Sequence, residues 1–270
     1  MNILFFGDVV GRAGRDAIFN HLPRLRSEFE LDAVIVSTDN AAGGFGVTPS
    51  VAKQFLEAGV DVLTGGDHVW DQRDAPQLLE EEPRLLRPHN FPDGTPGSGC
   101  RAFTLKNGKT LLVLHLLGQV FHREYLDSPF ACADAALKPY TLGKNVDAIL
   151  VDIHAEATSE KNAMGVYLDG RVSGVVGSHT HIPTADARIL PAGTAYHTDT
   201  GMCGNYDSVI GFKPETPLSI FTSKLRKQRM EVATSGGSIA ATMISTDDKT
   251  GLATRIVPIL RGGVFDASAA

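Results

Sequence analysis

Short apolar segments that alternate with amphipathic ones fill the first 82 residues, and this alternation restricts the fold more than any other feature of the chain. The apolar segments are short enough to be buried strands, and the amphipathic ones have helical spacing. A β-α-β-α-β order with short links is typical of a sheet covered by helices. The predicted strands are 2–7, 32–37 and 60–66, and the predicted helices are 13–30, 48–59 and 74–82.

Local signals place the ends of two of these helices. Thr48-Pro49 is a favourable start for the helix over 48–59, and Gly59 is a favourable stop. Pro23 predicts a kink or a break inside the helix over 13–30, because proline removes a backbone donor.

The rest of the chain adds more strands than helices. A long loop rich in Pro and Gly spans 83–100, and such loops inside a domain are usually functional. The final fifth, from about residue 230, has the pattern of a β-meander. Between them we predict strands over 101–106, 110–117, 147–154, 174–177 and 193–198, and helices over 131–138 and 159–168.

Composition limits the class of protein. With 270 residues, of which 43% are hydrophobic, the chain can build one large core, and we expect a single domain over 1–270. A formal net charge of −6 argues against a nucleic-acid groove and against a stable nucleic-acid complex. Homo-oligomerisation stays open.

Three scattered cysteines without CxxC spacing argue against a zinc ribbon or a disulfide framework and fit a reducing cytoplasm. The start MNILFFGD has no basic segment and is expected to be a strand, not a signal peptide. No apolar stretch approaches the roughly 20 residues that span a bilayer. We therefore expect a cytoplasmic protein without a membrane segment.

Polar side chains follow five of the predicted strands. In open α/β sheets, the carboxyl ends of the strands line one crevice where ligands bind, so these side chains are expected to share one rim. Each one alone has a structural explanation, as a turn residue, a cap or a core histidine. Their conjunction is what indicates a site. The residues are Asp8, Asp39, Asn40, Asp67, His68, His154, His179 and His181.

Oxygen and imidazole donors without thiolate predict two transition-metal ions, Fe or Mn, with Zn as the alternative. In VVGSHTHIP, His179 and His181 are two residues apart, so in an extended segment both imidazoles would face the same point. The neighbouring Gly7, Gly66 and Gly177 allow tight turns and close approach.

Other motifs are absent or have simpler explanations. The segment GDVVGRAG has neither GxGxxG spacing nor the GK[ST] of a P-loop, and no GxSxG occurs. In HAEATSEK we expect Thr158 or Ser159 to cap a helix, with acidic residues in its first turn. His197 and Asp199 are expected to support the ligand imidazoles.

Longer motifs point to a family. Over residues 1 to about 212 the chain resembles the YmdB-like bacterial branch of the calcineurin-like metallophosphoesterase superfamily. The resemblance implies an α/β fold, a β-sandwich flanked by helices in α/β/β/α layers. It also implies hydrolysis of small cyclic nucleotides, most of all 2′,3′-cyclic ones. The motifs are GDVVGRAGR, DNAAGGFGVT, GGDHVWD, RPHNFPDGTPG, DIHAEATSEK, DGRVSGVVGSHTHIPTAD and LPAGTAYHTDTGMCGNYDSVIG.

The resemblance also implies roles for single residues. His68 would protonate the leaving oxygen after a hydroxide shared by the two cations attacks phosphorus. The other seven residues would be metal ligands. Asp8, Asn40 and His181 would hold one cation, His154, His179 and Asp67 the second, and Asp39 would bridge the two.

Two positions depart from the family pattern, which has Glu at 39 and Asn at 67. Asp39 is one methylene shorter, and an ionised Asp67 accepts hydrogen bonds only and repels phosphate. We expect metal to be retained and turnover to be reduced. The alternatives are a catalytically impaired regulatory protein that binds metal and nucleotide, and a phosphomonoesterase or protein phosphatase on the same scaffold.

Overall fold

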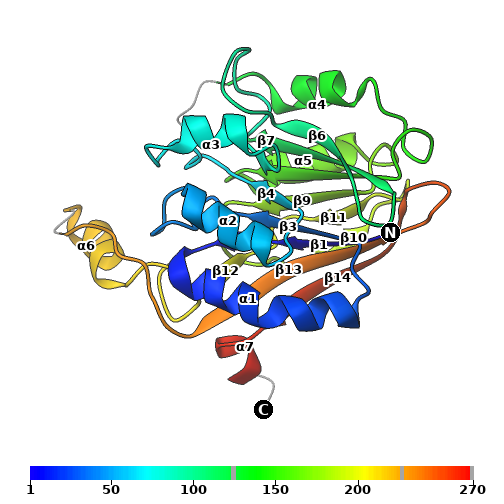
Figure 1. Cartoon of the computed structure of the whole chain (residues 1–270). Coiled ribbons are helices and arrows are strands. Elements are labelled where there is room, and N and C mark those ends of the chain that lie inside the picture. Colours follow the sequence, from blue (N-terminus) through cyan, green and yellow to red (C-terminus); the bar gives the residue numbers. More distant parts are fainter. Residues whose placement is uncertain (123–125, 226–227, 268–270) are drawn as a thin grey trace.

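The computed structural model describes residues 1–122, 126–225 and 228–267. In this part of the chain the strands form two sheets that face each other, and helices cover both outer faces (Figure 1). This arrangement confirms the predicted α/β class and the α/β/β/α layers. None of the described helices combines the length and the apolar character needed to cross a membrane.

The first sheet has a parallel centre continued by antiparallel strands. β1, β3, β4 and β5 run parallel to one another, and β13 pairs antiparallel with β1. The spatial order is β2-β12-β13-β1-β3-β4-β5, with β14 paired to β13. The strands are β1 (Asn2–Phe6), β2 (Asp8–Val9), β3 (Ala33–Ser37), β4 (Val62–Thr64), β5 (Leu85–Leu86), β12 (Met202–Asn205), β13 (Gly237–Thr246) and β14 (Ala253–Arg261).

The second sheet has the order β10-β11-β9-β8-β7-β6. Its four inner strands run parallel, and the two edge strands pair antiparallel with their neighbours. The strands are β6 (Cys100–Thr104), β7 (Thr110–Leu117), β8 (Ala148–His154), β9 (Gly174–Ser178), β10 (Arg188–Ile189) and β11 (Ala195–His197).

Five helices form the outer layers. Three lie on the first sheet and two on the second, whereas α6 stands at one side of the molecule and α7 lies near the C-terminal end (Figure 1). The helices are α1 (Gly11–Glu28), α2 (Pro49–Glu57), α3 (Ala75–Glu81), α4 (Pro129–Leu137), α5 (Thr158–Tyr167), α6 (Glu215–Ser223) and α7 (Val264–Ala267).

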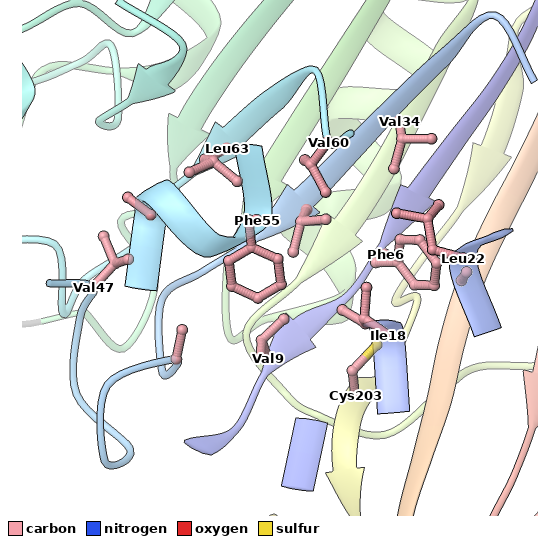
Figure 2. Packing of buried hydrophobic residues seen from close by; sticks show 14 of the residues in the cluster. Phe6, Val9, Ile18, Leu22, Val34, Val47, Phe55, Val60, Leu63 and Cys203 are labelled. Atoms are coloured by element: carbon pink, nitrogen blue, oxygen red, sulfur yellow. The ribbon is translucent and has the colours of Figure 1, made fainter. Parts of the chain in front are cut away.

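Alternation along β1 shows how the layers are held together. Side chains of a strand point to opposite faces in turn. Leu4 and Phe6 accordingly pack under the helices, in the cluster that Figure 2 shows from close by. Ile3 and Phe5 point the other way and pack against side chains of the second sheet. Burial on both faces explains why this strand is apolar from Ile3 to Phe6.

Most predicted elements are present, with small shifts. The helix over 48–59 is α2, in which the Thr48 hydroxyl accepts a hydrogen bond from the Val51 amide and Gly59 has φ 94°. α1 begins earlier than predicted, and Pro23 does not interrupt it. The C-terminal meander is the antiparallel pair β13 and β14. The helices α6 and α7 and the short strands β2, β5, β10 and β12 were not predicted.

Two sequence predictions are wrong. The helix predicted over 159–168 begins at Thr158 with Ala157 at its cap, and no side chain caps it. The polar strand ends also do not belong to one sheet. β1, β3 and β4 belong to the first sheet, and β8 and β9 to the second. Periodicity reports the burial of a strand but not its partners, so it could not divide the strands between two sheets.

Phe55 on α2 tests the packing of the helical layer on the first sheet. Its ring is fully buried in the cluster of Figure 2. The centroid of this ring lies 5.2 Å from that of the Phe19 ring. We expect Phe55→Ala to lower the free energy of unfolding by about 3–5 kcal/mol, because the cavity adds to the lost burial. The exposed neighbour Gln54 is the matched control, and Gln54→Ala should change it by less than about 0.5 kcal/mol. Equal denaturant midpoints for the two variants would contradict this packing.

Candidate metal centre

The eight candidate residues lie where strands of both sheets end. Asp8 lies within β2, directly after β1, and His154 is the last residue of β8. The others follow strands β3, β4 and β9 within a few residues. The candidate site is therefore built between the two sheets. The first sheet supplies the carboxylate and amide oxygens together with His68, and the second supplies the imidazoles of His154, His179 and His181.

Glycines let these chain segments approach one another. A Cβ atom on Gly7 would collide with the carbonyl oxygen of Gly201, and one on Gly177 with that of Thr198. A Cβ on Gly66 would lie 2.5 Å from Cγ of Asp39 and 2.6 Å from Cε1 of His154. The close approach predicted at the three glycines is present, although none of them has a positive φ.

Three donor atoms form a compact triangle at the centre of the site. Oδ1 of Asp67 lies 3.0 Å from Nε2 of His154, which lies 3.1 Å from Nδ1 of His179. The third side, from His179 Nδ1 to Asp67 Oδ1, is 3.3 Å. Ligands that share one transition-metal ion at roughly 2.1 Å lie about 3.0–3.4 Å from each other. The triangle has the dimensions of one face of a coordination sphere.

A second pair of donors lies beside the triangle. Nε2 of His181 is 3.0 Å from Oδ1 of Asn40. The Asn40 amide donates to the carbonyl of Gly44, so its oxygen is left to face the histidine. The segment His179-Thr180-His181, written HTH below after its three residues, thus has its two histidines in different parts of the site. The prediction of an extended backbone here is wrong, because φ is 93° at His179 and 67° at His181.

Each imidazole is held by its outward nitrogen. Nδ1 of His181 lies 2.8 Å from the carbonyl oxygen of Ile210, and Nε2 of His179 lies 3.3 Å from Oε2 of Glu156. Nδ1 of His154 lies 3.0 Å from Oγ of Ser178. Such contacts orient a ring so that its other nitrogen is presented as a ligand. All three inward nitrogens point to the same cluster.

A chain of buried hydrogen bonds continues from Ser178, the partner of His154, to the carboxylate of Asp152. The Ser178 hydroxyl donates to Oδ1 of Asp152 at 2.8 Å, and the Thr64 hydroxyl donates to Oδ2 at 2.8 Å. Sequence reasoning missed Asp152 and Ser178. Asp152 is two residues before His154 in the same strand and so lies on the same face, which is the signal that could have identified it. His115, also fully buried, lies 2.9 Å from this carboxylate.

The negative charges of three neighbouring carboxylates repel one another in a buried space. Burial, followed by the nearby charges of Asp67 and Asp8, raises the pKa of Asp39 well above its ordinary value. Burial would also raise the pKa of Asp67, but hydrogen bonds from His154 and His179 outweigh it and lower that pKa. For Asp8, burial opposes the ionised form, and the charge of His154 is the first of the effects that together lower its pKa. A bound cation would offset the repulsion between these negative charges.

His68 lies at the open side of the cluster. Its backbone amide donates to Oδ1 of Asp39 at 3.0 Å, and its Nδ1 lies 2.7 Å from Oδ2 of Asp71. Its Nε2 is 3.9 Å from Oδ2 of Asp67, and the ring packs edge-on against Phe45. One oxygen or nitrogen from each of Asp39, Asp67 and His68 falls within 4.8 Å of the others. The Asp71 contact leaves Nε2 of His68 as the nitrogen available to a ligand.

A cavity of about 310 Å³ opens onto these residues. Seven of its nine lining residues are polar or charged, and Ile210 and Phe212 form an apolar side. Neither apolar residue was predicted, because they belong to an irregular segment without periodicity. The lining residues are Asp39, Asn40, His68, Glu156, His179, Thr180, His181, Ile210 and Phe212.

Three further sequence predictions concern the surroundings of the site. The acidic residue predicted in the first turn of α5 is confirmed as Glu160, which is buried and accepts hydrogen bonds from the amides of Gln119 and Val120. His197 bonds to Thr242 and to the carbonyl of Thr184, and Asp199 contacts Thr180. The prediction that these two residues support the ligand imidazoles is wrong for His197, whereas Asp199 contacts the segment between His179 and His181 through Thr180. Sequence reasoning also missed Lys161, which is fully buried.

The residues present fit transition-metal ions. The donors are imidazole nitrogens and carboxylate and amide oxygens, and their spacing and outward contacts are those of a ligand set. Comparison with known proteins agrees. The family model described as YmdB-like protein matches residues 4–259. The chain belongs to the YmdB-like family. The resemblance drawn from the sequence motifs is thus confirmed.

Relatives of this YmdB-like protein are similar over almost their whole length. A 2′,3′-cyclic-nucleotide 2′-phosphodiesterase of Bacillus subtilis is 43% identical over 260 residues, which are 96% of this chain and 97% of the relative. A crystal structure of a novel phosphatase from Mycoplasma pneumoniae superposes with a TM-score of 0.90 at 33% identity, over 97% of this chain and 94% of that one. A protein from Thermus thermophilus also superposes with a TM-score of 0.90, at 40% identity over 97% and 100%.

Gly66 tests whether the cluster is a metal centre. An added methyl group would displace Asp39 or His154, so we expect Gly66→Ala to lose at least half of the bound metal in elemental analysis. Gly204→Ala is the matched control, because its Cβ would come no closer than 3.3 Å to any neighbour. Equal metal content in a folded Gly66→Ala protein would contradict the assignment.

Proposed function

We propose that this protein is a metal-dependent phosphodiesterase that hydrolyses small cyclic nucleotides, 2′,3′-cyclic ones first among them. The triangle of Asp67, His154 and His179 is the observation that carries the proposal, because it combines ligand spacing with ligand chemistry. The substrate class is taken from the Bacillus subtilis relative, at 43% identity. We further propose that 1–270 acts as one domain and works in the cytoplasm.

Seven residues would hold two cations, Fe or Mn with Zn as the alternative. Asp67, His154 and His179 would hold one, and Asn40, His181 and Asp8 the other, with Asp39 between them. Bound cations would supply Lewis-acid activation of water and would neutralise charge on the phosphoryl oxygens. Carboxylates alone would repel a phosphodiester, so the acidic cluster suits this substrate only with cations bound.

The chain's own residues would position the substrate and move one proton. His68 would hold a proton at Nε2 and deliver it to the departing ribose oxygen, since Asp71 occupies Nδ1. Ile210 and Phe212 offer an apolar surface for the ribose or the base. The cavity of about 310 Å³ suits a ligand the size of a mononucleotide and not a long polymer.

One observation favours a second candidate, a catalytically impaired protein that binds metal and nucleotide and acts as a regulator. Hydrogen bonds from His154 and His179 keep the pKa of Asp67 low, against the effect of burial. An ionised carboxylate at this place accepts hydrogen bonds but donates none, so it opposes a phosphoryl oxygen. The family pattern has a neutral Asn there.

His68→Ala tests the proposed acid. We expect kcat for a 2′,3′-cyclic nucleotide to fall about 10²–10⁴-fold, because the leaving oxygen loses its proton donor. Metal content should stay within error of the wild type, since His68 lies outside the triangle. His21→Ala on α1 is the control and should leave kcat unchanged. An unaltered kcat in His68→Ala would exclude this role.

The double variant Asp39→Glu, Asp67→Asn separates the two candidates. An amide at position 67 restores a donor towards the phosphoryl group, so we expect cyclic-diester hydrolysis to rise by about tenfold. A monoester assayed in parallel identifies a phosphomonoesterase. If the wild type and the double variant are both inactive when fully loaded with metal, the regulatory candidate replaces the enzyme.

A further inference from the structure

The two histidines of the HTH segment have a backbone that needs support from elsewhere. φ is 93° at His179 and 67° at His181, in the left-handed region that side chains other than glycine rarely occupy. Such conformations persist only where surrounding contacts hold them, and they concentrate at functional sites. The contacts that hold this segment therefore help to determine where the two imidazoles point.

Thr180, between the two histidines, carries the decisive contacts. Its hydroxyl and its backbone amide both donate to Oδ2 of Asp199, at 2.7 Å and 3.2 Å. On the other side, the amide of His179 donates to Oδ2 of Asp8 at 2.6 Å. The segment is thus held between two buried carboxylates, of which only Asp8 belongs to the candidate metal ligands.

Asp199 is itself held by a buried lysine. Nζ of Lys161 lies 2.6 Å from the same oxygen, Oδ2, and the amide of Gly201 donates to Oδ1 at 2.8 Å. Lys161 and Asp199 are both fully buried. Lysine is almost never fully buried unless it is paired, and a lone buried carboxylate would be costly. The pair therefore neutralises the charge that binds Thr180.

Lys161 reaches the pair from α5, on the outer face of the second sheet. Its side chain passes over Gly177 in β9, where an added Cβ would lie 2.9 Å from Cδ of the lysine. Gly177 directly precedes Ser178 and the HTH segment. The ion pair thereby ties the covering helix, the end of β9 and the segment after β11 to one point beneath the site.

We propose that the buried Lys161–Asp199 pair is a positioning device. It fixes Thr180, holds His179 and His181 in their left-handed conformations and so forms the ligand set before a cation binds. The inference rests on the proposed function, because it assumes that the two histidines are ligands. A pair that only stabilised the core would leave metal affinity unchanged when its contact with the segment is cut.

Thr180→Val cuts that contact and leaves the ion pair intact. We expect the dissociation constant for Mn²⁺, measured on metal-free protein by electron paramagnetic resonance, to rise about tenfold. Thr180→Ser retains the hydroxyl and should stay within threefold of the wild type. The Mn²⁺ concentration for half activation of Thr180→Val should rise about tenfold as well.

Thr194→Val controls for stability. Thr194 is a fully buried threonine just before β11, and its hydroxyl donates to the carbonyl of Val172. This variant should lose thermal stability without any change in Mn²⁺ affinity. If Thr180→Val also loses stability and binds Mn²⁺ as tightly as the wild type, the positioning role is wrong. A wild type that neither binds Mn²⁺ nor hydrolyses cyclic nucleotides would overturn the proposed function itself.

The double variant Lys161→Met, Asp199→Asn tests the pair directly. It removes both charges together, so no uncompensated charge is left in the core. We expect its Mn²⁺ dissociation constant to rise at least as much as that of Thr180→Val. Wild-type affinity in a folded double variant would contradict the proposal, and the Thr180 variants decide the matter if the double variant does not fold.

Discussion

Confinement of negative charge between the two sheets is the constraint on which the site depends. Asp8, Asp39 and Asp67 meet in a space from which water is largely excluded, and the pKa of Asp39 is raised as a result. Charge held in this way needs compensation by nearby imidazoles, hydrogen bonds or cations. The imidazoles compensate part of this negative charge. Cations bound at the inward nitrogens would compensate the rest.

The contacts that hold the imidazoles of the site in place are as distinct from one another as the imidazoles themselves. Each candidate ligand imidazole has an outward partner, and each partner differs in kind: a serine hydroxyl, a glutamate carboxylate and a backbone carbonyl. The carbonyl is that of Ile210, a β-branched residue with φ 48°. Positive φ values therefore occur both in the segment that carries His181 and in the segment that contacts its ring.

The sandwich explains how distant segments supply one site. β1, β3 and β4 are parallel neighbours in one sheet, and β8 and β9 are parallel neighbours in the other. Packing of Ile3 and Phe5 against the second sheet brings the ends of both sets to the same edge. Glycines at the strand ends then permit a closer approach than any side chain would allow.

The sequence alone determined the elements and the donors. Apolar runs mark the strands, and the polar residues that follow them, such as Asp8 and His154, are adjacent in the chain and need no knowledge of the fold. Only the tertiary structure decided the division of strands between two sheets, the left-handed backbone of His179 and His181, and the pairing of Lys161 with Asp199. These features arise from contacts between segments far apart in the chain, and local periodicity carries no information about such contacts.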